Sequence, residues 1–315
     1  MKRAWPWLRL ALAVAVLVAL GTRLGTGAFL DGLRAAAGWP ILAALLIGLL
    51  TTVASAWRWC VISRRLGLSL DLRTAVADYY RSQLLNAVLP AGVLGDVHRA
   101  VNQGKQSGDL GRGVRAVVFE RAVGQVVLVA IGLAVVSTQS IPGVDFVPGV
   151  EVLIICLGAL GAACVIAIRI PPIRRGLQAT WADLRVGVLH RAALPKLVSS
   201  SALAVAGHIG MFLVAAGAAG VTAPLSTLVP LIVLALLVMA VPVNIGGFGP
   251  REAFLAVAFG AAGLGAAQGL TTAVVYGVLA MVASLPGVLA LRVERREVPA
   301  ERGHQTGQQV LAFAG

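Results

Sequence analysis

The feature that most constrains this chain is a series of apolar stretches long enough to cross a lipid bilayer. Residues 38–57 and 197–219, for example, contain no charged side chain. A helix needs about 20 such residues to cross the hydrocarbon core, because each residue advances it by only about 1.5 Å. The whole chain is 58% hydrophobic and 12% charged, whereas a soluble protein carries about a quarter charged residues. The sequence therefore predicts an all-α integral membrane protein.

About eight transmembrane helices are expected in one membrane domain over residues 1–291, followed by a short polar cytoplasmic tail at 292–315. The apolar segments lie at 5–22, 38–57, 114–136, 150–170, 197–219, 226–243, 252–267 and 270–291. The seventh is short for a core of about 30 Å. The first carries Lys2 and Arg3 before its apolar run, as a cleavable signal does, but a retained first helix fits the charge pattern equally well.

The net charge of +13 is distributed in a way that favours a membrane topology over nucleic-acid binding. Lys and Arg gather at the N-terminus, in 58–115, in 169–196 and after residue 291. The connections 137–149, 220–225 and 264–269 contain neither residue. Because cytoplasmic loops of membrane proteins are enriched in Lys and Arg, both termini are expected in the cytoplasm. No nucleic-acid partner is expected.

Two segments interrupt the apolar pattern with glycine, proline and charge, near 84–98 and 242–251. Residues 71–81 before the first have the spacing of an amphipathic helix lying in the interface. Residues 84–98 are too short to cross and are flanked by basic sequence, which indicates a re-entrant segment. Pro90, Gly95 and Arg99 recur at one constant offset as Pro242, Gly247 and Arg251, which suggests an internal repeat, although chance matches are easy where glycine is abundant. Paired broken segments point to a transporter's binding site.

The second interruption contains the residue types of an anion-binding site. Gly246, Gly247 and Gly249 permit positive φ, so the chain from Asn244 to Gly249 is expected to be unwound, with a helix starting near Pro250. The free amides of a helix N-terminus attract anions. Arg251 adds a planar donor fork that matches phosphate, and Glu252 would hold that fork or sense protonation. The alternative is a plain helix break whose Arg-Glu pair reaches the headgroups.

Charged residues of the first half offer a second set of candidates. Asp96 and Arg99 follow the first broken segment, and Glu120 and Arg121 lie inside a predicted span. Charge within a membrane span is costly and marks a functional site by default; structural pairing is the alternative. Adjacent residues of a helix point about 100° apart, so Glu120 and Arg121 are expected to find partners elsewhere. His208 is expected to be a helix-packing residue, and Arg58, between Trp57 and Trp59, to lie in an aromatic belt at a span end.

These motifs resemble a known family. The pattern N-x-x-L-P-x-G-x-x-G-D-x-x-R over 86–99, the pair Glu120-Arg121, and P-x-N-x-G-G-x-G-x-R-E-A over 242–253 look like the membrane region of lysylphosphatidylglycerol synthase. That region is the flippase-like half of the multiple peptide resistance factor, which also occurs as free-standing proteins. The resemblance covers roughly 10–291 and implies a location in a bacterial inner membrane.

The resemblance implies a protein that moves a phospholipid or lipid-linked headgroup between leaflets. Arg99, Arg121 and Arg251 would then bind the lipid phosphate, while Asp96, Glu120 and Glu252 would orient those arginines or meet a cationic headgroup. The soluble synthase domain is not part of this chain, so we expect no enzymatic aminoacylation. No phosphate-binding loop for ATP occurs, and no metal or cofactor is expected. The alternatives are a membrane transferase acting on lipid-linked substrates, and a membrane partner or anchor of a lipid-modifying enzyme.

Overall fold

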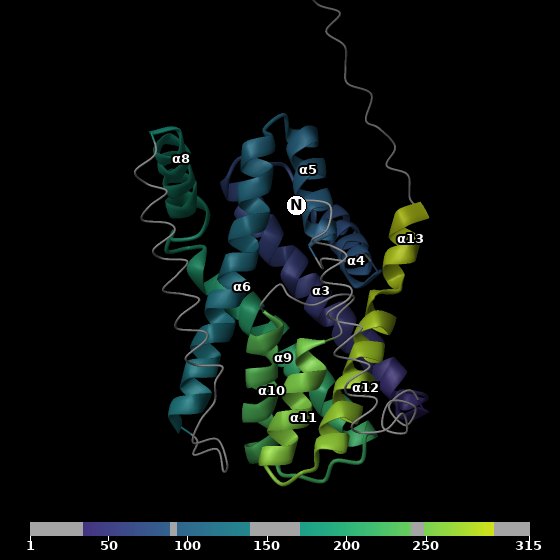
Figure 1. Cartoon of the computed structure of the whole chain (residues 1–315). Helices are drawn as coiled ribbons and strands as arrows, with labels where there is room; N and C mark the ends of the chain where they lie inside the picture. Colours follow the sequence, from purple (N-terminus) through teal and green to yellow (C-terminus); the bar gives the residue numbers. More distant parts are fainter. Residues whose placement is uncertain (1–33, 89–92, 139–170, 241–248, 293–315) are drawn as a thin grey trace, which may run out of the picture.

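The computed structural model describes residues 34–88, 93–138, 171–240 and 249–292 (Figure 1). All regular structure in these ranges is helical, as predicted. The helices are α3 (Trp39–Arg65), α4 (Leu72–Val88), α5 (Leu94–Ser107), α6 (Leu110–Thr138), α8 (Pro171–Gly187), α9 (Leu194–Ala218), α10 (Leu225–Met239), α11 (Pro250–Ala261), α12 (Ala266–Ser284) and α13 (Pro286–Arg292).

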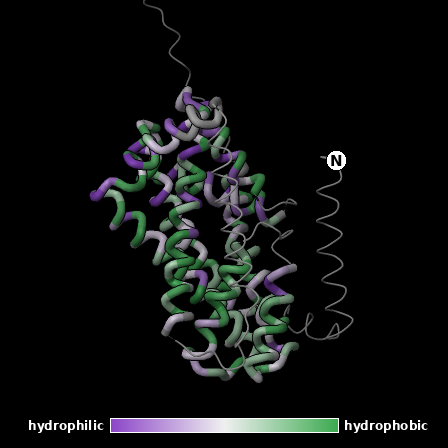
Figure 2. Tube along the Cα trace, turned by 60° about the vertical axis from the view of Figure 1, so that its left-hand side comes forward, coloured by the Kyte–Doolittle hydropathy of each residue, from purple (hydrophilic) through white to green (hydrophobic). Residues whose placement is uncertain are grey.

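Four stretches of helix within the described residues are long and apolar enough to cross a membrane: Trp39–Arg65, Leu110–Val135, Leu194–Ala218 and Ala266–Ala290. They match the predicted spans at 38–57, 114–136, 197–219 and 270–291. In Figure 2 the middle of the molecule is coloured hydrophobic, and hydrophilic residues gather at its upper end. The predicted spans at 5–22 and 150–170 lie outside the described residues, so these two stay predictions, and the total of eight is not confirmed.

The helices that lie within the predicted spans at 226–243 and 252–267 are too short to cross a bilayer. The α10 helix has 15 residues and α11 has 12, which correspond to about 22 and 18 Å of helix. The two lie side by side in the lower half of Figure 1. The Gln268 side chain at the start of α12 donates to the Gly220 carbonyl before α10, at 3.2 Å. Both ends of the α10–α11 pair therefore lie on one side of the molecule, and the pair is a hairpin rather than two spans.

A second hairpin, α4–α5, occupies the upper half of Figure 1. Its two helices touch near the tip, where the Gly95 N–H donates to the Asn86 side chain at 2.8 Å. A Cβ at Gly95 would lie 2.1 Å from the Ser82 carbonyl oxygen, so only glycine permits this approach. The other end is fixed near the end of α3, where the Gln103 amide donates to Ser63 at 2.8 Å. This close packing makes a re-entrant hairpin of the region around 84–98.

The expectation that 71–81 is a separate helix lying in the interface is wrong. The α4 helix continues without a break to Val88 and packs against α3, α5, α12 and α13. Ala75, Asp78 and Tyr79 are buried in that packing. The amphipathic pattern reflects a helix whose polar side chains meet partners on other helices, which a helical-wheel argument cannot distinguish from a helix facing water.

The order of elements repeats with inverted direction. A long helix, a hairpin and a second long helix occur first as α3, α4–α5 and α6, and again as α9, α10–α11 and α12. In Figure 1 α3 rises and α6 descends, whereas α9 descends and α12 rises. The residue matches that suggested a repeat are not structurally equivalent, since Arg99 is the sixth residue of α5 and Arg251 is the second of α11. The repeat is one of architecture.

Candidate functional site

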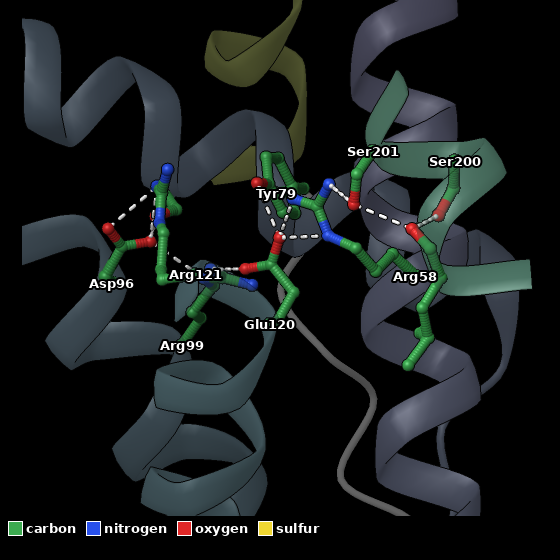
Figure 3. Close-up of polar contacts among 10 residues, drawn as sticks. Arg58, Tyr79, Asp96, Arg99, Glu120, Arg121, Ser200 and Ser201 are labelled. Carbon is green, nitrogen blue, oxygen red and sulfur yellow. Dashed lines mark hydrogen bonds and ion pairs between the residues drawn. The ribbon is translucent and has the colours of Figure 1, made fainter. Parts of the chain in front are cut away.

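Glu120 of α6 lies at the centre of a buried charge cluster (Figure 3). Its Oε1 accepts hydrogen bonds from Arg58 Nε of α3, at 3.1 Å, and from the Tyr79 hydroxyl, at 3.3 Å. Its Oε2 accepts from Arg99 Nη2 of α5, at 2.6 Å. The Glu120 side chain is completely buried. One carboxylate therefore joins three helices and neutralises part of the charge of two arginines.

Asp96, in the first turn of α5, is the second carboxylate of this cluster. Its Oδ1 accepts from Arg99 Nε at 2.9 Å, and its Oδ2 lies 2.8 Å from Arg121 Nη2. Ser82 and Asn86 on α4 also donate to it, at 3.1 and 3.4 Å. The adjacent residues Glu120 and Arg121 thus take different partners, as the 100° angle between them predicted.

Arg99 is the most enclosed cation of the cluster, with a side chain 1% exposed. Its guanidinium carbon lies 4.8 Å from the ring centroid of Trp59 and 4.6 Å from that of Tyr79. Such contacts with aromatic faces stabilise a desolvated cation. Its Nη1 is the only buried side-chain nitrogen or oxygen in the described part of the chain that lacks a hydrogen-bond partner.

The two carboxylates do not neutralise the cluster. Its described members carry three guanidinium groups, on Arg58, Arg99 and Arg121, and two carboxylates, on Asp96 and Glu120. One positive charge remains in a region bordered by apolar helices. Because a charge in such a region is stabilised by an opposite partner, an anion is the kind of ligand that would balance this charge.

The start of α11 forms a smaller polar group, as the sequence predicted. The helix begins at Pro250, and Gly249 before it has φ of 124°, a conformation that favours glycine. Glu252 Oε2 accepts the Gly249 N–H at 2.6 Å, and Oε1 accepts from Arg251 Nε at 3.0 Å. Glu252 therefore holds the Arg251 fork and occupies part of the helix N-terminus. The predicted site residues Asn244, Gly246 and Gly247 lie outside the described residues.

Arg251 also contacts the aromatic ring of Tyr276 on α12. Its guanidinium carbon lies 5.1 Å from the Tyr276 ring centroid. The Tyr276 hydroxyl lies 3.1 Å from His208 Nδ1, which joins α12 to α9. His208 was expected to be a packing residue; the structure adds a polar partner and a place on a cavity wall.

A cavity of about 410 Å³ lies between the two polar groups. Its walls include residues from both hairpins and from α3, α6, α9 and α12. Arg58, Arg121 and Arg251 line it. Arg99, Asp96, Glu120 and Glu252 are not among the lining residues. Arg99 pairs with Asp96 and Glu120, and Glu252 pairs with Arg251. Two of the three predicted arginines, Arg121 and Arg251, thus line one cavity, and Arg99 does not.

Arg58 is the site residue that sequence reasoning missed. It was assigned to an aromatic belt, but its side chain is 5% exposed and bonded to Glu120 and to Ser201 of α9, the latter at 3.0 Å. A signal was present, because the chain continues beyond it as Trp59-Cys60-Val61-Ile62 without polar residues. A cation followed by another helical turn of apolar residues is inside a helix bundle more often than at its edge.

Comparisons with known proteins identify the family of this chain. Neither the curated proteins nor the solved structures gave a match. A family model described as the lysylphosphatidylglycerol synthase transmembrane region matches residues 7–287, which confirms the resemblance carried by the motifs, and the chain belongs to that family.

Proposed function

We propose that this membrane protein binds the anionic headgroup of a phospholipid or lipid-linked molecule in the central cavity and moves it between leaflets. The observation that carries the proposal is the wall formed by Arg58, Arg121 and Arg251, which come from three different helices and face one cavity. Guanidinium groups match phosphate oxygens in geometry and charge. A volume of about 410 Å³ lies in the range of small-ligand sites, so the headgroup can enter while the acyl chains stay in lipid.

The arrangement of the carboxylates supports binding rather than bond-making chemistry. Glu120 and Glu252 are completely buried and paired with arginines. A general base must reach the proton that it removes, and these carboxylates are already hydrogen-bonded to cations. Their role in the proposal is to hold the guanidinium forks in position.

The two hairpins supply a route from either side. They enter from opposite ends of the molecule (Figure 1), and both contribute residues to the cavity wall, including Asn86 and Arg251. Inverted repeats with broken helices at mid-depth are the architecture of many secondary transporters. A small displacement of either hairpin would expose the same arginines to one leaflet at a time.

The orientation belongs to the same proposal. Arg64 and Arg65 end α3, Arg73 lies in the first turn of α4 and Arg112 in the first turn of α6. By contrast, the connections 219–224 and 262–265 contain no Lys or Arg. The positive-inside rule then places the α4–α5 end, together with both chain termini, in the cytoplasm of a bacterial cell.

The test uses purified protein in liposomes that contain a phosphatidylglycerol with a fluorescent acyl chain. Dithionite added outside destroys the accessible label, and the slow remaining loss reports movement from the inner leaflet. We expect Arg121→Ala and Arg251→Ala to lower the protein-dependent rate by at least about tenfold, because each removes a charge-assisted phosphate contact. Arg58→Lys, which keeps the charge that neutralises Glu120, should lower it less.

Arg112→Ala is the matched control, since the Arg112 side chain is 48% exposed and forms an ion pair with Asp109, which is also exposed. Thermal unfolding and size-exclusion chromatography establish that each variant is folded. Equal rates in wild type, Arg121→Ala and Arg251→Ala would overturn the proposal. Movement that appears only when a lipid-modifying enzyme is added would favour the alternative of a membrane partner.

A further inference from the structure

The cavity wall contains one kind of charge. Among the described lining residues, every side chain that is charged at neutral pH is an arginine. The other polar lining groups are hydroxyls and carboxamides, among them Ser55, Gln83 and Gln125, together with His208.

The acidic residues of the site do not line the cavity. Glu120 and Glu252 are completely buried, and Asp96 is 16% exposed with both oxygens bonded to arginines. Among the described lining residues, a ligand in the cavity would therefore meet guanidinium groups and neutral hydrogen-bonding groups, but no carboxylate oxygen. The Arg251–Glu252 pair has no net charge. The larger cluster keeps one excess positive charge, and this is the charge that a ligand would balance.

From this wall we propose the class of headgroup that the cavity accepts: a singly charged phosphodiester that carries an uncharged, hydroxyl-bearing group such as glycerol. The inference rests on the proposed function. One phosphodiester charge matches one excess positive charge. The hydroxyls of a polyol can exchange hydrogen bonds with carboxamide and hydroxyl side chains, which both donate and accept.

A headgroup with an amine is disfavoured by the same wall. An ammonium group would lie among guanidinium groups in a region of low dielectric, where like charges repel strongly. It would also lack the acidic partner that a buried cation requires. Specificity thus comes from repulsion of the wrong ligand as much as from attraction of the right one.

The test compares three lipids in the same liposomes, each labelled on an acyl chain: phosphatidylglycerol, phosphatidylethanolamine and lysyl-phosphatidylglycerol. They carry an anionic polyol, a zwitterionic and a cationic headgroup. We expect the wild-type protein to move phosphatidylglycerol at least about tenfold faster than either amine-bearing lipid, because like charges brought together in a binding site suppress binding of the wrong partner. Lipids retained by the purified protein should show the same order by mass spectrometry.

A substitution that adds a carboxylate to the wall sharpens the test. Gln83→Glu changes the charge with little change in shape, and the oxygen that accepts the Thr52 hydroxyl at 3.2 Å is retained. This variant should shift the ratio of rates towards phosphatidylethanolamine and lysyl-phosphatidylglycerol. Gln178→Glu on α8 is the control, because Gln178 is exposed and is not a lining residue; it should leave the ratio unchanged.

The outcomes separate the two proposals. Equal rates for all three lipids, or faster movement of lysyl-phosphatidylglycerol, would overturn the inference and leave lipid movement standing. An unchanged ratio in Gln83→Glu would also contradict it, because the wall charge would then not set the selectivity. If no lipid is moved or retained by the wild-type protein, both proposals fail.

Discussion

The two hairpins have the same place in the repeated architecture but are held in place by different chemistry. The α4–α5 hairpin is joined to its neighbours by side chains far apart in sequence, through Glu120, Arg99 and Arg58. The α10–α11 hairpin has a local charge pair, Arg251–Glu252, and is otherwise packed through apolar residues such as Leu231, Ile232 and Phe259, all with no exposed surface.

This difference teaches that one architecture can be specified in two ways. Buried ion pairs set the orientation of the first hairpin, because each guanidinium group must form directional hydrogen bonds with a particular carboxylate oxygen. Apolar packing fixes the second by shape and volume. The first hairpin should therefore be sensitive to loss of charge, and the second to loss of volume.

The largest effect is expected for Glu120→Gln. It leaves two arginines without their shared carboxylate, and breaking a buried pair costs about 3–5 kcal/mol of stability. Thermal unfolding in a fixed detergent measures the loss, with Arg112→Ala as the exposed control, expected to cost under about 1 kcal/mol. A Glu120→Gln protein as stable as that control would break the comparison, because the first hairpin would then not depend on charge.

Removal of volume from the second hairpin comes next. Leu231→Ala in α10 should cost about 2–5 kcal/mol, because it creates a cavity in a closely packed core. Leu225→Ala is its partner variant on the same helix, where the side chain is 62% exposed. A similar melting temperature for the two variants would show that α10 is not held by its packing.

A smaller effect is expected for Glu252→Gln, the charge change in the second hairpin. It affects one arginine rather than two, and the remaining amide oxygen can still accept a hydrogen bond, so we expect a loss of about 1–3 kcal/mol. Measured beside Glu120→Gln in the same detergent, it tests the contrast directly. The idea that charge matters less in the second hairpin fails if Glu252→Gln is the more damaging of the two.

The smallest effect concerns the start of each hairpin. Asp71 accepts the Thr74 N–H at 2.9 Å and caps α4, whereas the residue before α10, Pro224, makes no side-chain cap. Asp71→Ala should cost about 1 kcal/mol at neutral pH. Hydrogen bonds from the side chain and backbone of Thr74 lower the pKa of Asp71 below its ordinary value of 3.8.

The sign of the pH effect follows from that shift. A carboxyl group whose pKa is lower in the folded state stabilises the protein above its unfolded-state pKa, and the contribution disappears as pH falls through the folded-state pKa. The difference between wild type and Asp71→Ala should therefore be constant near neutral pH and vanish below the ordinary carboxyl range. A difference that grows in acid would contradict the capping role.

The sequence predicted the features that depend on local pattern. Long spans such as α3 and α9 follow from hydropathy alone, and the helix start at Pro250 follows from the chemistry of Gly249 and proline. Features that depend on pairing between distant helices were missed or misplaced. Arg58 finds Glu120 only after α3 and α6 pack together, and α4 meets its polar partners on other helices, so neither environment is present in a local window.

Arg58 has one further consequence for how such a protein would move. Its hydrogen bonds to Glu120 and Ser201 connect α3 to α6 and α9. Parting α3 from α6 would leave a buried guanidinium group without its carboxylate, which is costly. If the protein moves a lipid as proposed, we therefore expect the displacement in the α10–α11 hairpin, whose packing is mainly apolar.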